Sequence, residues 1–398
     1  MCRRLCLFAL GLSIAVYSGV YRHAVDVHAQ LDGMTLLGLS ASEYRPFDTA
    51  KFGSGLVWLT DDWLLTTKRN SLGVYDAVTN KLLAYREWEY DEDKEWYLDE
   101  SNRKMPLLVD PVLGFLADNG SRLVTYHGNG VIRIWTTRDW ALEKTIESDL
   151  FRKRDFEVRL TPDKRYIYAI LEYTNKKGRT GFLDWRTGKL VNLGAPRCVL
   201  GFSRSGNYAL ALEDGVLEVY SYPDWRQVAQ TRALQRYGVS NYFDSPVICF
   251  GVSDEELFIA RSWGERKDWF LCVYNWAKDK EVRYCTGEQF ISWPQFYATT
   301  KYTPPPIIGD RLALFQTVKP GENRFPGWML WDFKRLFPAL EYTLPKPWSM
   351  GQFFIVSPNA KRIYFYIHTP EFKEVKTFVG VVPADWHLAA AHLKDIND

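Results

Sequence analysis

The sequence predicts an all-β protein built from repeated four-stranded units. Its 398 residues are 46% hydrophobic and 16% aromatic, a composition that favours strands around a large packed core. Residues 114–146 consist of four short apolar runs separated by polar turns, which is the pattern of an antiparallel meander. Units of the same pattern recur along the chain. Together these observations indicate a β-repeat architecture rather than a set of unrelated domains.

The stretch 114–146 shows the repeat with the fewest insertions. Strands are expected at residues 114–117, 122–126, 131–135 and 141–146. The turn His127-Gly128-Asn129-Gly130 contains residues that tolerate positive φ, as a tight antiparallel hairpin requires. A single meander cannot bury both of its faces, so it needs stacked copies of itself.

Seven segments of the chain can be aligned with this unit. They lie near residues 54–86, 113–147, 156–194, 198–231, 246–285, 306–344 and 351–393. At the end of the third strand, an aromatic or aliphatic residue precedes a small polar one, in the pairs Tyr75-Asp76, Trp135-Thr136, Leu183-Asp184, Tyr220-Ser221, Tyr274-Asn275 and Trp331-Asp332. The turn into the fourth strand recurs as Arg138-Asp139-Trp140, Pro223-Asp224-Trp225 and Ala384-Asp385-Trp386.

This pattern resembles the WD-repeat (WD40-like) β-propeller superfamily. In that family each blade is a four-stranded meander, and seven blades surround a central channel. Trp331-Asp332 reproduces the namesake dipeptide at its place, and no Gly-His pair precedes the blades. The resemblance implies a single β-propeller domain over residues 30–398 with seven four-stranded blades. Six blades with a divergent flanking segment is the alternative count.

A propeller ring must be closed by joining its two ends. Residues 34–39, MTLLGL, are expected to supply a strand to the last blade. The reason is that the fourth strand of that blade would otherwise be residues 387–392, HLAAAH, which are Ala-rich and weakly β-forming. The alternative is that residues 387–392 form a short helix outside the ring.

The first 29 residues have the order of a secretory signal. Arg3 and Arg4 precede an apolar run, and a more polar segment follows it. Cleavage before Gln30 is expected, which would make the protein periplasmic, secreted or lumenal. If residues 5–21 are not cleaved, they would instead form an N-terminal membrane anchor.

The charge of the chain argues against nucleic-acid binding. The full sequence has 50 basic and 48 acidic residues. Removing residues 1–29 takes away three arginines and one aspartate, which leaves a neutral chain. The positive field that dominates nucleic-acid binding is therefore absent.

The long insertions are predicted to lie on one face of the ring. In an up-and-down meander, turns alternate between the two ends of the strands. All long insertions follow second or fourth strands, at residues 87–113, 173–181, 232–245, 262–268, 285–306, 317–326, 343–350 and 369–376. Long loops on a rigid scaffold usually carry binding sites. We therefore expect the recognition surface at this end of the channel.

Residues 87–100 form an acidic insertion, EWEYDEDKEWYLDE. Trp88, Tyr90, Trp96 and Tyr97 alternate with its acids, and these aromatics are candidate binding residues. A cationic partner is one interpretation, and a solvated acidic flap anchored by its aromatics is the other. The spacing of its carboxylates fits no standard calcium loop, so no metal site is predicted.

Residues 289–302, QFISWPQFYATTKY, form an aromatic insertion. Trp293, Phe296 and Tyr297 could stack on sugar rings or peptide aromatics, because flat apolar faces with polar tips suit both. They could equally pack on neighbouring blades. Trp263, in another long loop, is a further candidate for the same surface.

The sequence contains no recognisable linear motif of catalysis or cofactor binding. The chain has no Gly-rich phosphate loop, nucleophile elbow or zinc signature, so no cofactor, metal or catalytic residue is predicted. None of the four histidines outside the leader has metal-ligand spacing. His127, which lies in a hairpin turn, is expected to be exposed to solvent.

Four cysteines remain once the leader is removed. If Lys278 and Asp279 form a two-residue turn, Cys272 lies directly opposite Cys285, where a disulfide can form. A one-residue slip in register would instead leave these two as buried thiols. Cys198 and Cys249 are expected to be reduced core residues.

The favoured function is an exported, non-catalytic scaffold that binds a protein or peptide through its long-loop face. A carbohydrate-binding propeller that uses the aromatic insertion 289–302 is the first alternative. A propeller hydrolase or oxidoreductase with a site at the channel mouth is the second. An uncleaved N-terminal segment would provide the only membrane contact.

Overall fold

The computed structural model describes most of the repeat region. The described residues are 35–36, 39–40, 44–68, 70–89, 96–98, 104–106, 111–148, 158–174, 177–213, 215–237, 247–261, 269–289, 293–295, 307–309, 311–318, 327–344, 346–382 and 386. The leader 1–29, Tyr90, Trp263, Phe296, Tyr297 and residues 387–392 lie outside them, so predictions that concern these residues stay predictions.

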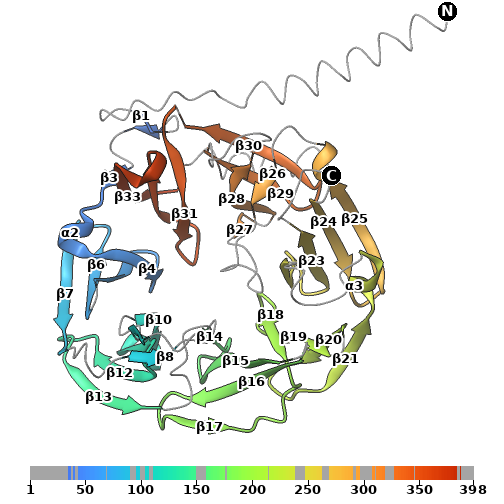
Figure 1. Cartoon of the computed structure of the whole chain (residues 1–398), viewed down its shortest axis with the longest axis horizontal. Coiled ribbons are helices and arrows are strands. Elements are labelled where there is room, and N and C mark those ends of the chain that lie inside the picture. Colours follow the sequence, from blue (N-terminus) through green and yellow to red (C-terminus); the bar gives the residue numbers. More distant parts are fainter. Residues whose placement is uncertain are drawn as a thin grey trace, which may run out of the picture.

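Antiparallel sheets are arranged in a ring (Figure 1). Among the described residues, six sheets of the ring are four-stranded blades and one further sheet has five strands. The predicted all-β propeller fold is confirmed. The predicted seven four-stranded blades are corrected to six such blades and one five-stranded sheet.

The first five blades follow one another along the chain. The first blade consists of β4 (Ser54–Trp58), β5 (Trp63–Thr67), β6 (Ser71–Asp76) and β7 (Lys81–Glu87). The second consists of β10 (Pro111–Ala117), β11 (Arg122–His127), β12 (Val131–Thr136) and β13 (Leu142–Glu147). The third consists of β14 (Val158–Leu160), β15 (Tyr166–Thr174), β16 (Lys177–Asp184) and β17 (Lys189–Val191). The fourth consists of β18 (Val199–Phe202), β19 (Tyr208–Glu213), β20 (Val216–Ser221) and β21 (Gln227–Thr231). The fifth consists of β22 (Val247–Phe250), β23 (Glu256–Arg261), β24 (Phe270–Asn275) and β25 (Lys280–Thr286).

The ring is completed by two sheets that depart from this simple order. The five-stranded sheet contains β26 (Trp293–Gln295), β27 (Ile307–Ile308), β28 (Leu312–Val318), β29 (Gly327–Asp332) and β30 (Phe337–Thr343). The closing blade contains β31 (Ser349–Val356), β32 (Arg362–His368), β33 (Val375–Val381) and, from the other end of the chain, β3 (Tyr44–Pro46). Two hairpins lie outside the ring sheets: β1 (Thr35–Leu36) with β2 (Leu39–Ser40), and β8 (Trp96–Leu98) with β9 (Lys104–Pro106).

The N-terminal part of the chain closes the ring, although not with the predicted residues. β3 pairs with β33, with Tyr44 opposite Gly380 and Pro46 opposite Phe378. Residues 34–39 were expected in this role, but β1 and β2 pair with each other instead. A short link, which includes the helix α2 (Thr49–Phe52), joins β3 to the first blade. This short link can reach only from one sheet to the next. β3, the strand just before the link, therefore becomes the outer strand of the closing blade.

Six of the seven turns after third strands contribute one aromatic residue to the seam with the preceding sheet. We call the six members of this set the wedge residues, because each packs on a ring in the preceding sheet. The pairs and their ring-centroid distances are Trp140 with Trp63 (5.8 Å), Trp185 with Phe115 (5.9 Å), Trp225 with Phe182 (5.5 Å), Trp276 with Tyr208 (5.3 Å), Phe333 with Phe258 (3.9 Å) and Trp386 with Trp328 (6.2 Å). The recurring Asp-Trp turns of the sequence therefore have a packing role.

The pairing of third and fourth strands contains a recurring irregularity. In five sheets, the pairing register between the third and fourth strands shifts by one residue. The shift comes just before the aromatic residue near the end of the third strand. The register leaves one extra residue on the fourth strand at Leu83, Glu143, Val228, Val282 and Ala339. Each extra residue is a β-bulge, which bends the outer strand and reverses the faces of the side chains beyond it.

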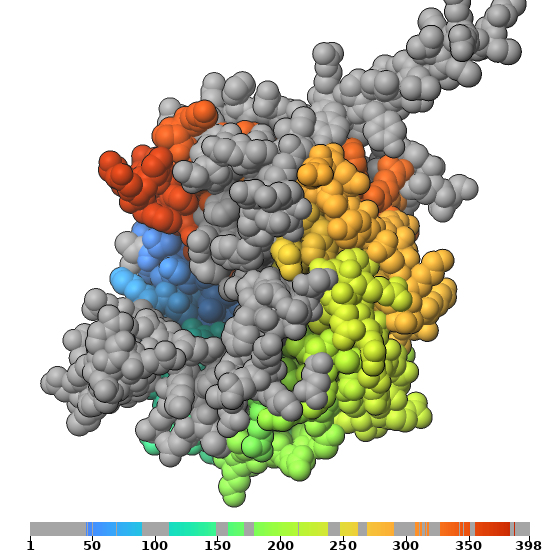
Figure 2. Space-filling view, turned by 45° about the vertical axis from the view of Figure 1, so that its right-hand side comes forward, coloured from blue at the N-terminus to red at the C-terminus, as the bar shows by residue number. Residues whose placement is uncertain are grey.

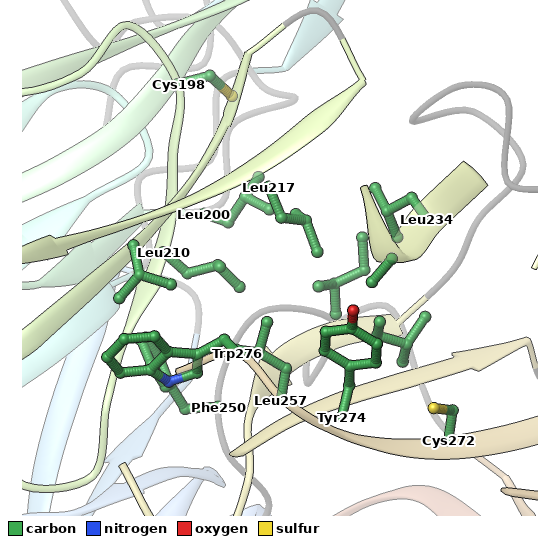
Figure 3. Close-up of a cluster of buried hydrophobic side chains, with 14 of the residues drawn as sticks. Cys198, Leu200, Leu210, Leu217, Leu234, Phe250, Leu257, Cys272, Tyr274 and Trp276 are labelled. Atoms are coloured by element: carbon green, nitrogen blue, oxygen red, sulfur yellow. The ribbon is translucent and has the colours of Figure 1, made fainter. Parts of the chain in front are cut away.

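The bulge at Val282 explains why the predicted disulfide is wrong. Cys272 lies opposite Tyr284, and Cys285 lies opposite Leu271. The two cysteines therefore point to opposite faces of the fifth blade, and both are free and buried. Cys272 belongs to the core between the fourth and fifth blades (Figure 3), whereas Cys285 faces the five-stranded sheet.

Cys198 and Cys249 are also free and buried, as predicted. Cys198 lies in the core between the fourth and fifth blades, near Leu200 (Figure 3). Cys249 packs in the cluster between the fifth blade and the five-stranded sheet. Both therefore behave as small apolar residues of the core.

The described helices are short. The four-residue helix α3 (Ala233–Arg236) follows the fourth blade, and its buried Ala233 and Leu234 cover the core between the fourth and fifth blades. Among the described residues, no helix has the length and apolar character needed to cross a membrane.

Removing β3 should destabilise the ring, whereas removing the residues before it should not. A chain that begins at Tyr44 keeps β3 and Phe47, whose ring packs on Tyr75 (5.1 Å) and Tyr364 (5.4 Å). A chain that begins at Asp48 loses both, and the loss of one buried aromatic residue alone costs about 3–5 kcal/mol. Denaturant unfolding of both chains checks this, and equal midpoints would show that β3 does not hold the ring closed.

The thiols should make stability depend on pH in the alkaline range. Burial raises the pKa of Cys272 and of Cys285 from 9.0 to about 12. Their contribution is complete below pH 9.0 and is lost as pH rises toward 12, because only the unfolded thiols ionise there. Unfolding midpoints measured across this range should therefore fall with pH.

The variant Cys272→Ala should show a shallower fall than the unmodified chain. In addition, the chain without residues 1–29 should show four free thiols after denaturation without reductant. A lower thiol count would mean that a disulfide forms in spite of the observed register.

Candidate functional site

The meander order divides the connections between two faces of the ring. Turns between first and second strands and between third and fourth strands form one face, which we call the short-turn face. Turns between second and third strands, together with the links between sheets, form the long-connection face. The β8–β9 hairpin and the extended β15–β16 hairpin belong to the long-connection face. In Figure 2 the fourth and fifth blades, in yellow-green and orange, form one continuous outer surface beside it.

Part of the aromatic insertion is incorporated into the five-stranded sheet. β27 pairs with Leu312 and Ala313 at the start of β28, and β26 pairs with residues 316–318 at its end. Both strands therefore occupy the first-strand edge of β28, in two consecutive pieces. Trp293 lies in β26 opposite Val318, at the end nearest the long-connection face. This split edge is the reason that the sheet has five strands.

The acidic insertion contains a hairpin rather than only a solvated flap. Trp96 and Tyr97 lie in β8, where their partners are Pro106 and Met105 of β9. A hairpin of this size is marginally stable alone, so it depends on how its base is attached to the ring.

Trp88 attaches the base of the acidic insertion to the ring. Its backbone N–H donates to the carbonyl of Asn70 (3.0 Å), and the side-chain amide of Asn70 donates to the carbonyl of Trp88. Its indole ring meets His127 edge-on at 4.8 Å, and the guanidinium of Arg133 lies 4.6 Å from the ring centroid. Of the predicted binding residues, Trp88 thus has a structural role at the junction of the first and second blades.

His127 is buried, and the prediction that it is exposed is wrong. Its side chain is 0% exposed, because Trp88 covers the turn that contains it. The Nε2 atom of His127 lies 3.0 Å from the hydroxyl of Thr125, which also accepts a hydrogen bond from the indole of Trp135 (3.1 Å). The second blade therefore has an internal polar network that links its second and third strands.

The closing blade presents an apolar tip on the long-connection face. We call residues 369–376, the turn between β32 and β33 together with the first two residues of β33, the Phe372 tip. Phe372 is 56% exposed and Val375 is 50% exposed, both high values for apolar side chains. The ring of Phe372 stacks on His368 at 4.0 Å, which holds it in one orientation.

The backbone of the Phe372 tip is both strained and well supported. Glu371 has φ 61° and Phe372 has φ 54°, values that cost about 1–3 kcal/mol each for residues other than glycine. Backbone bonds from Phe372 N to Thr369 O (3.0 Å) and from Thr369 N to Glu374 O (2.9 Å) hold the turn. Strain that surrounding bonds maintain at an exposed aromatic residue is a common property of recognition sites.

The charges of the Phe372 tip neutralise one another. Lys373 pairs with Glu371 at 2.9 Å, and Lys376 pairs with Glu374 at 3.5 Å. The ammonium of Lys376 also lies 4.9 Å from the ring of Trp348. The tip therefore offers an apolar contact without a net charge.

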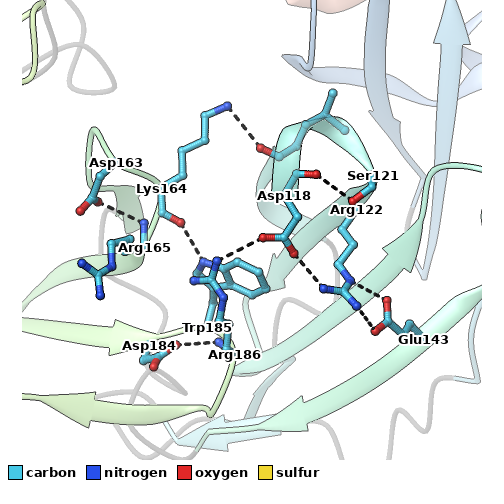
Figure 4. Close-up of polar contacts among 11 residues, drawn as sticks. Asp118, Ser121, Arg122, Glu143, Asp163, Lys164, Arg165, Asp184, Trp185 and Arg186 are labelled. Atoms are coloured by element: carbon cyan, nitrogen blue, oxygen red, sulfur yellow. Dashed lines mark hydrogen bonds and ion pairs between the residues drawn. The ribbon is translucent and has the colours of Figure 1, made fainter.

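The short-turn face is occupied by contacts between neighbouring blades. Asp118 of the second blade accepts from Arg122 (2.8 Å) and from Arg186 of the third blade (3.3 Å), and Arg122 also contacts Glu143 at 2.6 Å (Figure 4). The hydrogen bond from Arg122, followed by the attraction of Arg186, lowers the pKa of Asp118. This carboxylate therefore remains charged through the neutral range.

The same arrangement recurs at the ring closure and at the fourth blade. Asp61 of the first blade accepts two hydrogen bonds from Asn359 of the closing blade, at 2.9 and 3.0 Å. The hydroxyl of Ser205 in the fourth blade donates to Asp254 of the fifth. These polar groups join neighbouring blades on the short-turn face.

Among the described residues, no group of three His, Cys, Asp or Glu side chains is placed to hold a metal ion. On the long-connection face, the Phe372 tip combines an exposed aromatic side chain with internally paired charged groups. This arrangement suits surface recognition, in which an exposed aromatic anchor is surrounded by a polar rim.

Comparison with known proteins places the fold. No family model matches the sequence, and no curated protein matches it either. Among solved structures, a chain from "Crystal Structure of Mitotic Checkpoint Complex" is similar, with a TM-score of 0.52 and 11% sequence identity. The match covers 86% of this chain and 92% of that chain. The shared fold is a β-propeller. At this identity the likeness concerns the fold alone.

The long-connection face was predictable from the sequence, whereas the Phe372 tip was not. The loop 369–376 was recognised as one of the long insertions, yet its single aromatic residue gave no compositional signal. The left-handed conformation at Glu371 and Phe372 is also unexpected, because neither residue favours positive φ. Only the three-dimensional turn shows that Phe372 is both exposed and fixed.

Replacing Trp88 by alanine should loosen the acidic insertion without opening the ring. The half-buried indole contributes about 1–3 kcal/mol of burial, and its loss removes the contacts to His127 and Arg133. Limited proteolysis with mass mapping should show faster cleavage within residues 90–110. Trp88→Phe retains a ring against His127 and should stay close to the unmodified chain, and equal cleavage of all three proteins would contradict the anchoring role.

Proposed function

We propose that the protein is an exported, non-catalytic β-propeller scaffold that binds another protein or an extended peptide through its long-connection face. The observation that carries this proposal is the difference between the two faces. Polar groups of the short-turn face are engaged between blades, whereas the long-connection face presents the exposed, strained Phe372 tip. Aromatic residues held in this way are typical anchors of protein interfaces.

Two further features support a protein partner. The internal pairing of charges at the Phe372 tip favours a partner that offers an apolar pocket over a strongly charged ligand. The similar propeller in the solved structure belongs to a complex of proteins, which agrees with a scaffold role. Export is supported by the order of Arg3, Arg4 and the apolar run in the leader. N-terminal sequencing of the mature protein should begin at Gln30, and detection of an intact leader would favour the membrane anchor.

The two alternatives depend on other parts of the chain. Carbohydrate binding depends on Trp293, Phe296 and Tyr297, of which only Trp293 is described, as part of a strand edge. A hydrolase or oxidoreductase would need reactive groups that converge at the channel mouth. Glycan binding that is lost in Trp293→Ala would favour the first alternative over the scaffold.

A photoreactive amino acid at position 372 should capture the partner in the exported fraction of the native source. The same group at position 142 is the matched control, because Leu142 is 48% exposed but lies on the outer strand β13. A discrete covalent adduct is expected from position 372 and none from position 142. Identical adducts from both positions would count against the Phe372 tip.

With the captured partner in hand, Phe372→Ala should weaken binding by about tenfold or more, as the loss of a central aromatic anchor does. Leu142→Ala should leave the affinity unchanged. Because both side chains are exposed, neither substitution should shift the unfolding midpoint. An unchanged affinity for Phe372→Ala would remove this residue from the interface.

A further inference from the structure

Two Asn-Gly dipeptides occur in the chain, and both lie in turns of the second blade. Asn119-Gly120 joins the first and second strands, and Asn129-Gly130 joins the second and third. An asparagine followed by glycine is chemically labile, because glycine has no side chain to shield its backbone nitrogen. The same reactive pair is thus present twice in one blade, in two different environments.

The reaction at such a pair requires only water. The backbone nitrogen of the glycine attacks the side-chain carbonyl carbon of the asparagine, a C–N bond forms, and the side-chain nitrogen leaves as ammonia after proton transfer. Water then opens the resulting five-membered succinimide at either carbonyl. Opening at one carbonyl gives aspartate, and opening at the other gives isoaspartate, in which the main chain runs through the side-chain carbon. No oxidation or reduction takes place.

The environment of Asn119 permits this attack. Asn119 is exposed, and neither its side-chain amide nor the N–H of Gly120 makes a hydrogen bond within the described part of the chain. A Cβ atom at Gly120 would meet nothing within 4 Å, so no packed side chain blocks the attack, and the carbonyl of Gly120 accepts a hydrogen bond from the Thr137 hydroxyl (2.7 Å). Asn119 has φ 56° and ψ 33°, and rotation about ψ is needed to bring the Gly120 nitrogen to the side-chain carbonyl. The bond from Ser121 N to Asp118 O (3.2 Å) closes this turn at the surface.

The environment of Asn129 opposes the same attack. Asn129 is only 7% exposed, and its Oδ1 atom accepts a hydrogen bond from Val131 N (3.3 Å). The N–H of Gly130 donates to the carbonyl of His127 at 2.9 Å, so the attacking nitrogen is engaged. The carbonyl of Gly130 in turn accepts from Ser148 N at 3.1 Å. Attack here requires a buried turn to open first.

We propose that Asn119 is a site of spontaneous, succinimide-mediated deamidation in the folded protein and that Asn129 is protected. The inference goes beyond the proposed function and does not rest on it. The product carries a new carboxylate at the residue that follows Asp118, and Asp118 belongs to the group of charges that joins the second and third blades (Figure 4). Isoaspartate also lengthens the main chain of the turn that positions Asp118 toward Arg186.

The proposal is tested by incubating the folded full-length chain at mildly alkaline pH. The chain is produced without glycosylation, so that the side chain of Asn119 is unmodified at the start. Peptide mapping by mass spectrometry should show the exchange of amide for acid, with isoaspartate resolved by electron-based fragmentation. Residue 119 should react faster than residue 129 by about tenfold or more, because the buried bonds from Val131 N to Asn129 Oδ1 and from Gly130 N to His127 O must first break at residue 129. In the denaturant-unfolded chain the two sites should react at similar rates.

Two variants complete the test. The acidic species that ion exchange first detects in the incubated unmodified chain should be absent from Asn119→Gln. Asn119→Asp should elute with one component of that acidic species. Equal rates at residues 119 and 129 in the folded protein would overturn the proposal, as would the absence of reaction at residue 119 while the unfolded chain reacts at both sites.

Discussion

The ring depends on the packing of wedge residues, which follow the third strand in six of its seven sheets, against the sheet before them. A four-stranded meander has two apolar faces, so its stability comes from the seams that it makes with its neighbours. At these seams the wedge residues bury large aromatic rings, and Trp185 and Trp386 are among the most deeply buried residues of the protein. Trp185 and Trp276 also donate their indole N–H groups to carbonyls of their own blades, at 2.8 and 2.6 Å. These two wedge residues therefore fix a turn and a seam at once.

The wedge also explains why bulky residues adopt left-handed backbone conformations. Trp140 has φ 58° and Trp225 has φ 51°, which costs about 1–3 kcal/mol at each position. Truncating a buried aromatic side chain costs about 3–5 kcal/mol, so packing outweighs the strain. The recurrence of the Asp-Trp turn made the repeats detectable, because this interaction demands a large ring at one place. Repeat existence and turn position were thus predictable from sequence, and so was the fold.

The strand register beyond these turns could not be predicted, because the extra residues at the bulges are of no common type. The extra residues include Leu83, Glu143 and Val282, which share exposure rather than chemistry. A one-residue shift reverses the faces of a strand, and this separated Cys272 from Cys285. The burial of His127 was missed for a similar reason, since it depends on Trp88 from a distant part of the sequence. The candidate face, in contrast, followed from strand order alone, which the bulges do not change.

A closed and rigid ring has a consequence for recognition. The polar contacts of Asp61, Asp118 and Asp254 join neighbouring blades on the short-turn face, so that end of each blade is held by its neighbours. The opposite end can then carry a strained turn without unfolding, because β32 and β33 are paired along their full length below it. Phe372 is held by its stack on His368 before any partner arrives. An anchor fixed in advance loses little conformational entropy on binding, so in the proposed function the rigidity of the ring favours binding at the Phe372 tip.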